Sequence, residues 1–236
     1  MRNYSFFKKI TTTIIIGVVS FSCEPNTTRN NEQAKATDKP QSESNIIYGD
    51  LIIKEQSDYL MIPVNFPDQS QDKQSNVSLS RSYERNNLLY NLIFYRKQDG
   101  EAHLLLNKKA IINHFEFLEV KTAAKPITRV WLYKIIDQDT NADKKIDTQD
   151  AIIGYISDLA GKNLQQITPN NTQIVNWVVL PSQNAILVKI LKDSNNDKKF
   201  TGEDKTNFVR VNLDKPDIGS EIISDRLEEE IKSYIK

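Results

Sequence analysis

The chain has 236 residues, of which 31 are Lys or Arg and 31 are Asp or Glu, so its formal net charge is zero. A balanced charge argues against a nucleic-acid partner, because such a partner requires a basic face. The single cysteine excludes a disulfide framework.

The N-terminal segment has the three-part layout of a secretory signal. Three basic residues precede the uncharged run Ile10–Phe21, which ends directly before Ser22 and Cys23. The run is too short to cross a membrane as a helix, since that requires about 20 apolar residues. A cysteine directly after the apolar core makes residues 1–22 resemble a bacterial lipoprotein signal peptide.

The resemblance implies that Cys23 carries the lipid, palmitate included, and becomes the mature N-terminus. Ser20-Phe21-Ser22 departs from the commoner Leu-Ala-Gly type of sequence before this cysteine. An ordinary signal peptide cleaved nearby and an uncleaved anchor are the alternatives. We expect a membrane-anchored lipoprotein of the cell envelope, at the outer membrane or the periplasmic face.

Residues 23–44 are predicted to be the lipidated cysteine followed by a disordered tether. From Glu24 to Ser44 the only apolar side chains are Ala, and Asn, Gln, Thr and Ser are frequent. Such a segment cannot bury enough surface to offset its ordering entropy. We expect its ends to lie roughly 25 Å apart on average.

Residues 45–236 are predicted to form a single β-rich domain, which is long enough for a sizeable core. Short runs of Ile, Val, Leu, Tyr and Phe between polar residues and Gly predict strands. These runs are Ile46–Ile53, Tyr59–Asn65, Leu88–Tyr95, Ala102–Leu106, Val130–Ile136, Ile152–Ile156, Val175–Leu180, Ala185–Leu191 and Asn207–Val211. The polar segment Asp68–Asn87 is predicted to be a long loop.

The C-terminal segment has apolar residues at helical intervals from Ile223 to Tyr234, which predicts a helix. Ser220 is its expected N-cap. The predicted fold is therefore mainly β, with antiparallel hairpins or blade-like sheets and one C-terminal helix.

An acidic segment occurs twice in the chain. DTNADKKIDTQD occupies Asp139–Asp150, DSNNDKKFTGED occupies Asp193–Asp204, and both read D-x-N-x-D-K-K-(Ile/Phe)-x-x-x-D. Apolar strand-like runs flank both copies, so the duplicated unit is a hairpin, at about 127–168 and 181–222.

Each copy resembles the calcium loop of the EF-hand and dockerin families. Calcium takes six to eight oxygen ligands, which these loops supply from positions 1, 3, 5, 7, 9 and 12. The resemblance implies two structural calcium sites. The first would comprise Asp139, Asn141, Asp143, the Lys145 carbonyl, Asp147 and Asp150. The second would comprise Asp193, Asn195, Asp197, the Lys199 carbonyl, Thr201 and Asp204. The apolar position 8 is Ile146 or Phe200.

Both copies depart from these families. Lys144 and Lys198 stand at position 6, where the families usually have Gly for a sharp turn. Position 12 is Asp, as in dockerins, rather than the longer Glu of sensor loops. Strands, rather than helices, are predicted to precede the loops, so the resemblance implies a metal loop without the EF-hand fold. The alternative is a solvated acidic turn, because Asp and Asn favour turn geometry by themselves.

Two further segments indicate hairpins. Leu92–Tyr95 and Ala102–Leu106 predict a third hairpin without metal ligands, closed at Asp99-Gly100. Tyr155–Pro169 resembles a hairpin of the WD40-like propeller repeats in periplasmic proteins of the TolB type. That resemblance implies blade-like sheets. A closed propeller is left open, because the folded part is short for a six- or seven-bladed ring.

Nothing in the sequence encodes a recognised catalytic motif. His103 and His114 lie in apolar strand-like runs, which favours half-buried, hydrogen-bonded histidines over catalytic ones. With neither a motif nor a catalytic histidine indicated, enzyme activity is disfavoured. The favoured function is a binding or scaffold module with an unidentified protein or glycan partner. The alternative is a lipid-anchored hydrolase or carbohydrate-handling protein, for which an exposed Trp131 or Trp177 would stack on sugar.

Overall fold

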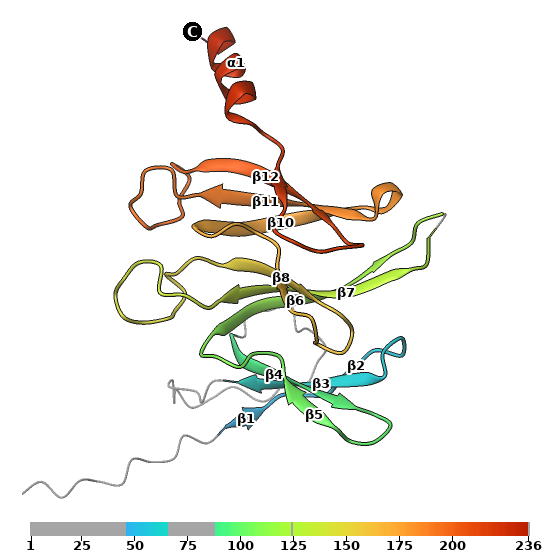
Figure 1. The fold of residues 1–236 in the computed structure, drawn as a ribbon. Helices are drawn as coiled ribbons and strands as arrows, with labels where there is room; N and C mark the ends of the chain where they lie inside the picture. The colour runs from blue at the N-terminus through green and yellow to red at the C-terminus, as the bar shows by residue number, and fades with distance from the viewer. Residues whose placement is uncertain (1–45, 66–87, 124, 236) are drawn as a thin grey trace, which may run out of the picture. The chain divides into compact units, whose positions relative to one another are not determined.

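The computed structural model describes residues 46–65, 88–123 and 125–235, which belong to one compact unit, Glu43–Lys236. The predicted signal peptide, Cys23, the tether and the predicted loop Asp68–Asn87 lie outside these residues. The prediction of a mainly β fold with one C-terminal helix is confirmed (Figure 1).

All strand pairs are antiparallel. The strands of the first sheet are β1 (Ile47–Tyr48), β2 (Ile52–Ile53), β3 (Tyr59–Asn65), β4 (Leu89–Arg96), β5 (Ala102–Leu104), β6 (Ile111–Val120), β7 (Thr128–Ile136), β8 (Ile153–Ser157) and β9 (Gln165–Gln166). Those of the second are β10 (Thr172–Leu180), β11 (Ala185–Lys192), β12 (Lys205–Asn212) and β13 (Ser220–Glu221). A 3-10 turn, Pro181–Gln183, joins β10 to β11, and α1 is Asp225–Ile235.

The chain repeats a meander of four strands. In β6–β9 and again in β10–β13, each strand pairs with the next one along the chain. Both meanders carry a β-bulge in their first strand, beside Ile112 and beside Ile174. In both, an acidic loop joins the second strand to the third, so the sequence repeat corresponds to a repeated supersecondary unit.

The two sides of β7 pack into different hydrophobic clusters. Leu132 packs with Ile186 and Val188 of the second sheet. Trp131 and Tyr133, which point the opposite way, pack with residues of β3 and β4 such as Met61 and Phe94. Alternate side chains of a strand point to opposite faces, so β7 is buried on both. That explains its nearly unbroken apolar sequence.

The buried Tyr133 shows how this middle strand accommodates a polar atom. Its hydroxyl lies 2.7 Å from Ser157 Oγ, on the neighbouring strand β8. Burial raises the pKa of Tyr133 far above its usual value, so the phenol stays neutral. Among the described residues the strands form two open sheets, and these sheets do not close into a propeller ring.

Three local predictions were wrong. Ile46–Ile53 is two short strands separated at Gly49 and Asp50, rather than one. Strand β6 was not among the predicted strands, because its bulge breaks the alternation of apolar and polar residues. Ser220 lies in β13, and the helix N-cap is Ser224, whose Oγ accepts the Leu227 N–H at 3.3 Å.

Candidate metal centres

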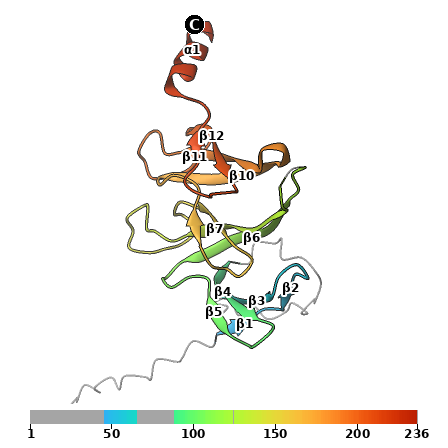
Figure 2. The same ribbon diagram turned by 45° about the vertical axis from the view of Figure 1, so that its right-hand side comes forward.

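The two acidic loops occupy equivalent places in the repeated meanders. Asp139–Asp150 lies between β7 and β8, and Asp193–Asp204 lies between β11 and β12. Figures 1 and 2 show both loops extending from the same side of the sheets. Each loop connects two paired strands, so the sheet fixes the positions of its two ends. The residues between the ends are outside the strand ladder and can adopt backbone conformations that a strand does not allow.

The first residue of each loop organises the turn that follows. Asp139 Oδ1 accepts the Asp143 N–H at 3.1 Å, and Oδ2 accepts the Lys144 N–H at 2.8 Å. The same two bonds join Asp193 to Asp197 and Lys198, at 3.1 Å each. Position 1 therefore binds the main chain of positions 5 and 6 in both copies.

Positions 3 and 5 continue this pattern. Asn141 Oδ1 accepts the Asp143 N–H at 2.9 Å, and Asp143 Oδ1 accepts the Lys145 N–H at 2.8 Å. In the second loop the corresponding bonds are Asn195 to Asp197 at 3.0 Å and Asp197 to Lys199 at 2.9 Å. In both loops, therefore, the side-chain oxygens of positions 3 and 5 accept the main-chain N–H groups two residues further on.

The backbone takes a left-handed conformation at positions 4 and 6 of both loops. The φ angles are 64° at Ala142 and 70° at Lys144 in the first loop, and 59° at Asn196 and 62° at Lys198 in the second. Left-handed backbone is unfavourable for residues with a Cβ other than Asn and Asp. The two lysines therefore adopt the conformation that calcium loops usually assign to Gly, in spite of the local strain.

The last residue of each loop closes it. Asp150 is buried, and its Oδ1 accepts the Thr140 N–H at 2.7 Å while Oδ2 accepts the Asp147 N–H at 3.0 Å. Asp204 does the same with Ser194 at 3.1 Å and Thr201 at 2.8 Å. The N–H groups of Thr201 and Ser194 hold the pKa of the Asp204 carboxyl below its usual value.

Position 2 was not identified from the sequence, although both copies have a hydroxyl there. Thr140 Oγ1 lies 3.2 Å from Asp150 Oδ1 and accepts the Ala151 N–H at 2.9 Å. Ser194 Oγ lies 3.5 Å from Asp204 Oδ1 and accepts the Lys205 N–H at 3.2 Å. The repeated Thr or Ser after the first Asp was the available signal.

The remaining loop positions are less constrained. Asp147 Oδ1 accepts the Gln149 N–H at 2.9 Å, and Thr201 Oγ1 accepts the Glu203 N–H at 3.2 Å. The apolar position-8 residues, Ile146 and Phe200, are half-buried. Lys145 and Lys199 lie at position 7, where the resemblance to calcium loops implies a carbonyl ligand.

Among the described residues, no group of three or more His, Cys, Asp or Glu side chains is gathered closely enough to hold a metal ion. The carboxylates of the loops are instead spaced around main-chain amides. An ionised carboxylate offers about four lone-pair sites, so the Asp oxygens that accept one N–H each keep further acceptor capacity. The donor set of carboxylate, amide and hydroxyl oxygens suits a hard cation such as calcium.

The loops approach each other across a small cavity. Thr140 of the first loop and Asp193, Asn196 and Phe200 of the second line a cavity of about 180 Å³ together with Asn171. The Asp193 N–H donates to the Asn171 carbonyl at 3.4 Å. The residue directly before β10 thus adjoins the start of the second loop.

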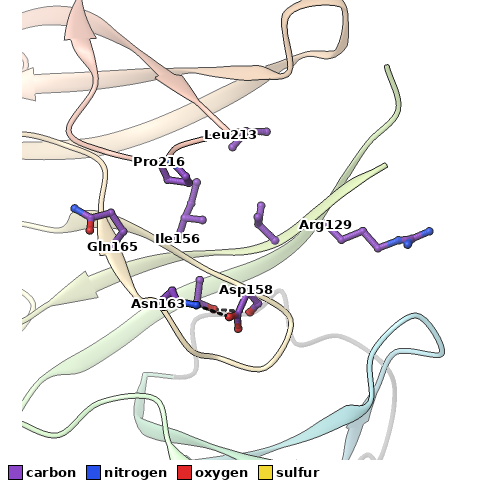
Figure 3. Close-up of a pocket in the computed structure, with 9 residues that line it drawn as sticks. Arg129, Ile156, Asp158, Asn163, Gln165, Leu213 and Pro216 are labelled. Atoms are coloured by element: carbon purple, nitrogen blue, oxygen red, sulfur yellow. Dashed lines mark hydrogen bonds between the residues drawn. The ribbon is translucent and has the colours of Figure 1, made fainter. Parts of the chain in front are cut away.

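A second cavity of about 300 Å³ lies beside β8 and carries polar residues at its edge (Figure 3). Asp158 accepts N–H groups from Ala160 and Lys162 and the side-chain amide of Asn163. Arg129 Nε donates to Glu119 at 2.8 Å. The two charged residues that line this cavity are therefore engaged within the protein, which argues for a structural role.

The two histidines have the structural character that the sequence predicted. His103 is half-buried, with Nε2 2.9 Å from the Ala160 carbonyl oxygen and its ring stacked on Phe94. His114 is half-buried against Trp177, with the ring centroids 5.9 Å apart.

The two tryptophans do not form an exposed aromatic row. Trp131 is 3 % exposed and lies in the core. Trp177 is half-buried, and Lys134 Nζ lies over its ring, 5.3 Å from the centroid.

No helix within the described segments has the length and apolar character that crossing a membrane would require. Comparison with known proteins adds no relative: the chain matches no protein-family model, no curated protein and no solved structure.

Proposed function

We propose that this protein is a lipid-anchored binding or scaffold module of the cell envelope, stabilised by one calcium ion in each of its two acidic loops. The lipid would be carried by Cys23. Calcium would have a structural role, because each loop connects two adjacent strands of a sheet and ties its own ends together.

The observation that carries the calcium proposal is the identity of the two loops in hydrogen bonding and backbone conformation. Position 1 binds the amides of positions 5 and 6 in both, and positions 4 and 6 are left-handed in both. An acidic turn with no further role needs neither the repeat of these details nor two strained lysines. A cation that draws Asp139, Asp143 and Asp147 together would offset that strain and the mutual repulsion of the carboxylates.

The expected affinity is modest. Each loop lacks the Gly at position 6 and the bidentate Glu at position 12 of tight sensor loops, and each carries two lysines. We therefore expect dissociation constants on the order of 10⁻⁴–10⁻³ M, which is the range of extracellular modules. Such sites would be filled outside the cytosol, in agreement with the proposed export signal.

Calorimetry of residues 45–236 with and without calcium tests the metal sites. A ligand that binds only the folded state stabilises it by about 2.7 kcal/mol at a hundredfold excess over Kd. Magnesium is expected to do less, because it requires a tighter octahedral site. The variant Asp139→Ala/Asp193→Ala is the control and should lose the calcium-dependent shift. Identical melting in chelator and in millimolar calcium would contradict the proposal.

Fractionation of cells tests the anchor. Cys23→Ser should release the protein from the membrane pellet, because the lipid on Cys23 is the proposed anchor. A variant that stays in the pellet at the wild-type level and resists a salt wash would contradict lipidation at Cys23.

The alternative of a carbohydrate-handling protein receives no support from the aromatic residues. Trp131 is buried and the face of Trp177 is occupied by Lys134. Stacking of a sugar ring on Trp131 would require the core to open, and stacking on Trp177 would require Lys134 to leave.

A further inference from the structure

The sheet formed by β2, β3, β4 and β5 has a second apolar face. Strand pairing places two rows of side chains on it, Ile53–Leu60–Tyr95 and Ile62–Ile93–Leu104. The alternate residues of the same strands, such as Met61 and Phe94, belong to the hydrophobic core. The two rows therefore lie on the side of the sheet that faces away from the core.

Three residues of this outer face are exposed, and the other three, Leu60, Ile62 and Ile93, are half-buried. Ile53 is 59 %, Leu104 54 % and Tyr95 38 % exposed. Antiparallel sheets with one solvated face normally carry polar residues on it. Tyr48 and Leu51, 59 % and 55 % exposed, extend the apolar surface along the edge beside β1. Apolar side chains that are neighbours across several strands form a patch, and such patches are often functional.

A second copy of the chain is a poor occupant of this face. A face four strands wide and three residues long covers at most about 200 Å², from a strand spacing of about 4.8 Å and a rise of about 3.4 Å per residue. Stable protein–protein interfaces bury about 800 Å² per partner. The face is therefore too small for a dimer that rests on it alone.

The position of the face in the chain favours a lipid surface. Ile46 begins the described fold, and only residues 24–45 separate it from Cys23. A polar segment of that length reaches roughly 25 Å on average. A lipid on Cys23 would thus hold β1 and β2 within reach of the bilayer, and would raise the effective concentration of the outer face at the bilayer surface. For a protein that is already tethered in this way, a small apolar face is enough to make contact with the bilayer.

We propose that the outer face of β2–β5, with Tyr48 and Leu51 at its edge, rests on the lipid bilayer and sets the orientation of the anchored protein. This inference depends on the proposed lipid anchor at Cys23. Tyr48 and Tyr95 suit the headgroup level, because their rings are apolar and their hydroxyls are polar. The acidic loops of the two meanders would then be left for the aqueous side.

The test uses the full chain purified from membranes and reconstituted into phosphatidylcholine vesicles with brominated acyl chains, which quench nearby tryptophan. A tryptophan is introduced by Tyr48→Trp or, should that variant fold poorly, by Leu104→Trp. The matched control is Val178→Trp on β10, a site that is 60 % exposed and lies outside this face. Trp131 and Trp177 contribute the same background to every variant.

We expect quenching of the tryptophan at position 48 or 104 to exceed that at position 178 at least threefold. Adding Ile53→Asp to the Tyr48→Trp variant should remove most of the excess quenching over Val178→Trp. Equal quenching at the three positions, or none in protein that floats with the vesicles, overturns the inference and leaves the anchor intact. A fluorescence change that follows protein concentration instead of lipid would assign the face to a second copy and also overturn it. Protein that fails to float with the vesicles refutes the anchor, and the inference falls with it.

Discussion

Asp150 and Asp204 close two loops in the same way: each carboxylate accepts the N–H groups of loop positions 2 and 9. Both residues are buried at the point where the loop rejoins the sheet. The bond across the loop ties its start to its end without a metal. The closing Asp therefore stabilises the fold even when no cation is bound.

Replacing this residue should destabilise the calcium-free protein. Asp150→Ala leaves the N–H groups of Thr140 and Asp147 without their acceptor. Hydrogen bonds to a charged group contribute about 1.5–3 kcal/mol, so we expect a loss of about 3 kcal/mol in the free energy of unfolding. Urea denaturation in chelator measures it. Asp143→Ala, at an exposed position, is the control and should lower the free energy of unfolding by less than half as much.

A glycine in the cluster around Phe94 is predicted to be irreplaceable. Gly161 has φ +70°, and a Cβ there would lie 2.4 Å from the Phe94 ring. Gly161→Ala should cost about 3 kcal/mol or more, since overpacking and left-handed strain add. Gly202→Ala is the control, because a Cβ added there would meet no atom within 4 Å and its φ is not left-handed. Comparable melting temperatures for the two variants would contradict this account.

The sequence predicted the strands best where the apolar run is continuous, as in Val130–Ile136. It failed at β6, where a bulge beside Ile112 shifts the alternation of faces, and a simple two-residue periodicity does not show a bulge. The acidic loops could be identified because the spacing of their Asp and Asn residues is local and occurs twice. The role of Thr140 was missed, since its partners Asp150 and Ala151 are distant in sequence and meet it only when the loop closes.

The outer apolar face could not be predicted for a related reason. Ile53, Ile93 and Leu104 belong to three strands, and each is an unremarkable strand residue by itself. Only the register Ile93–Leu104 and the packing of Met61 and Phe94 on the opposite side show that they share an exposed face.

Acid should weaken the protein through its depressed carboxyl pKa values. The pKa of Asp204 is lowered by backbone donors, and that of Glu228 by Lys205 and Lys232. A carboxyl whose pKa is lower in the folded state contributes stability above its unfolded pKa, which is 3.8 for Asp. That contribution is lost as the pH falls below this value and through the folded pKa.

Urea denaturation in chelator at pH 6 and pH 3 measures this loss. The free energy of unfolding should be lower at pH 3, and Asp204→Asn should reduce the difference between the two values. An unchanged difference in the variant would show that other carboxyls account for the acid sensitivity.

Replacing a strained lysine of the acidic loops by glycine should raise the calcium affinity of that loop. Lys144→Gly removes a Cβ from a residue at φ 70° and a positive charge from the loop. Relief of strain and the greater freedom of Gly in the unfolded chain nearly cancel, so stability in chelator should change by less than about 1 kcal/mol. Calcium affinity should rise about two- to fivefold, as expected for loss of an unfavourable surface charge interaction. Lys162→Gly, outside the loops, is the control for calcium affinity and should leave it unchanged.

The two loops should differ in calcium affinity, because they differ in the number of carboxylates at the proposed ligand positions. The first carries Asp at positions 1, 5, 9 and 12, whereas the second has the neutral Thr201 at position 9. Backbone geometry cannot produce the difference, since the hydrogen bonds from positions 1, 3 and 5 match within a few tenths of an ångström. An additional carboxylate strengthens the attraction for a divalent cation.

Asp139→Ala should therefore remove more of the calcium-dependent stabilisation than Asp193→Ala. Calorimetric titration of both variants decides the matter, and an equal or reversed order would mean that the carboxylate count does not control these sites. Thr201→Asp then provides the converse measurement: it should raise the affinity of the second loop toward that of the first.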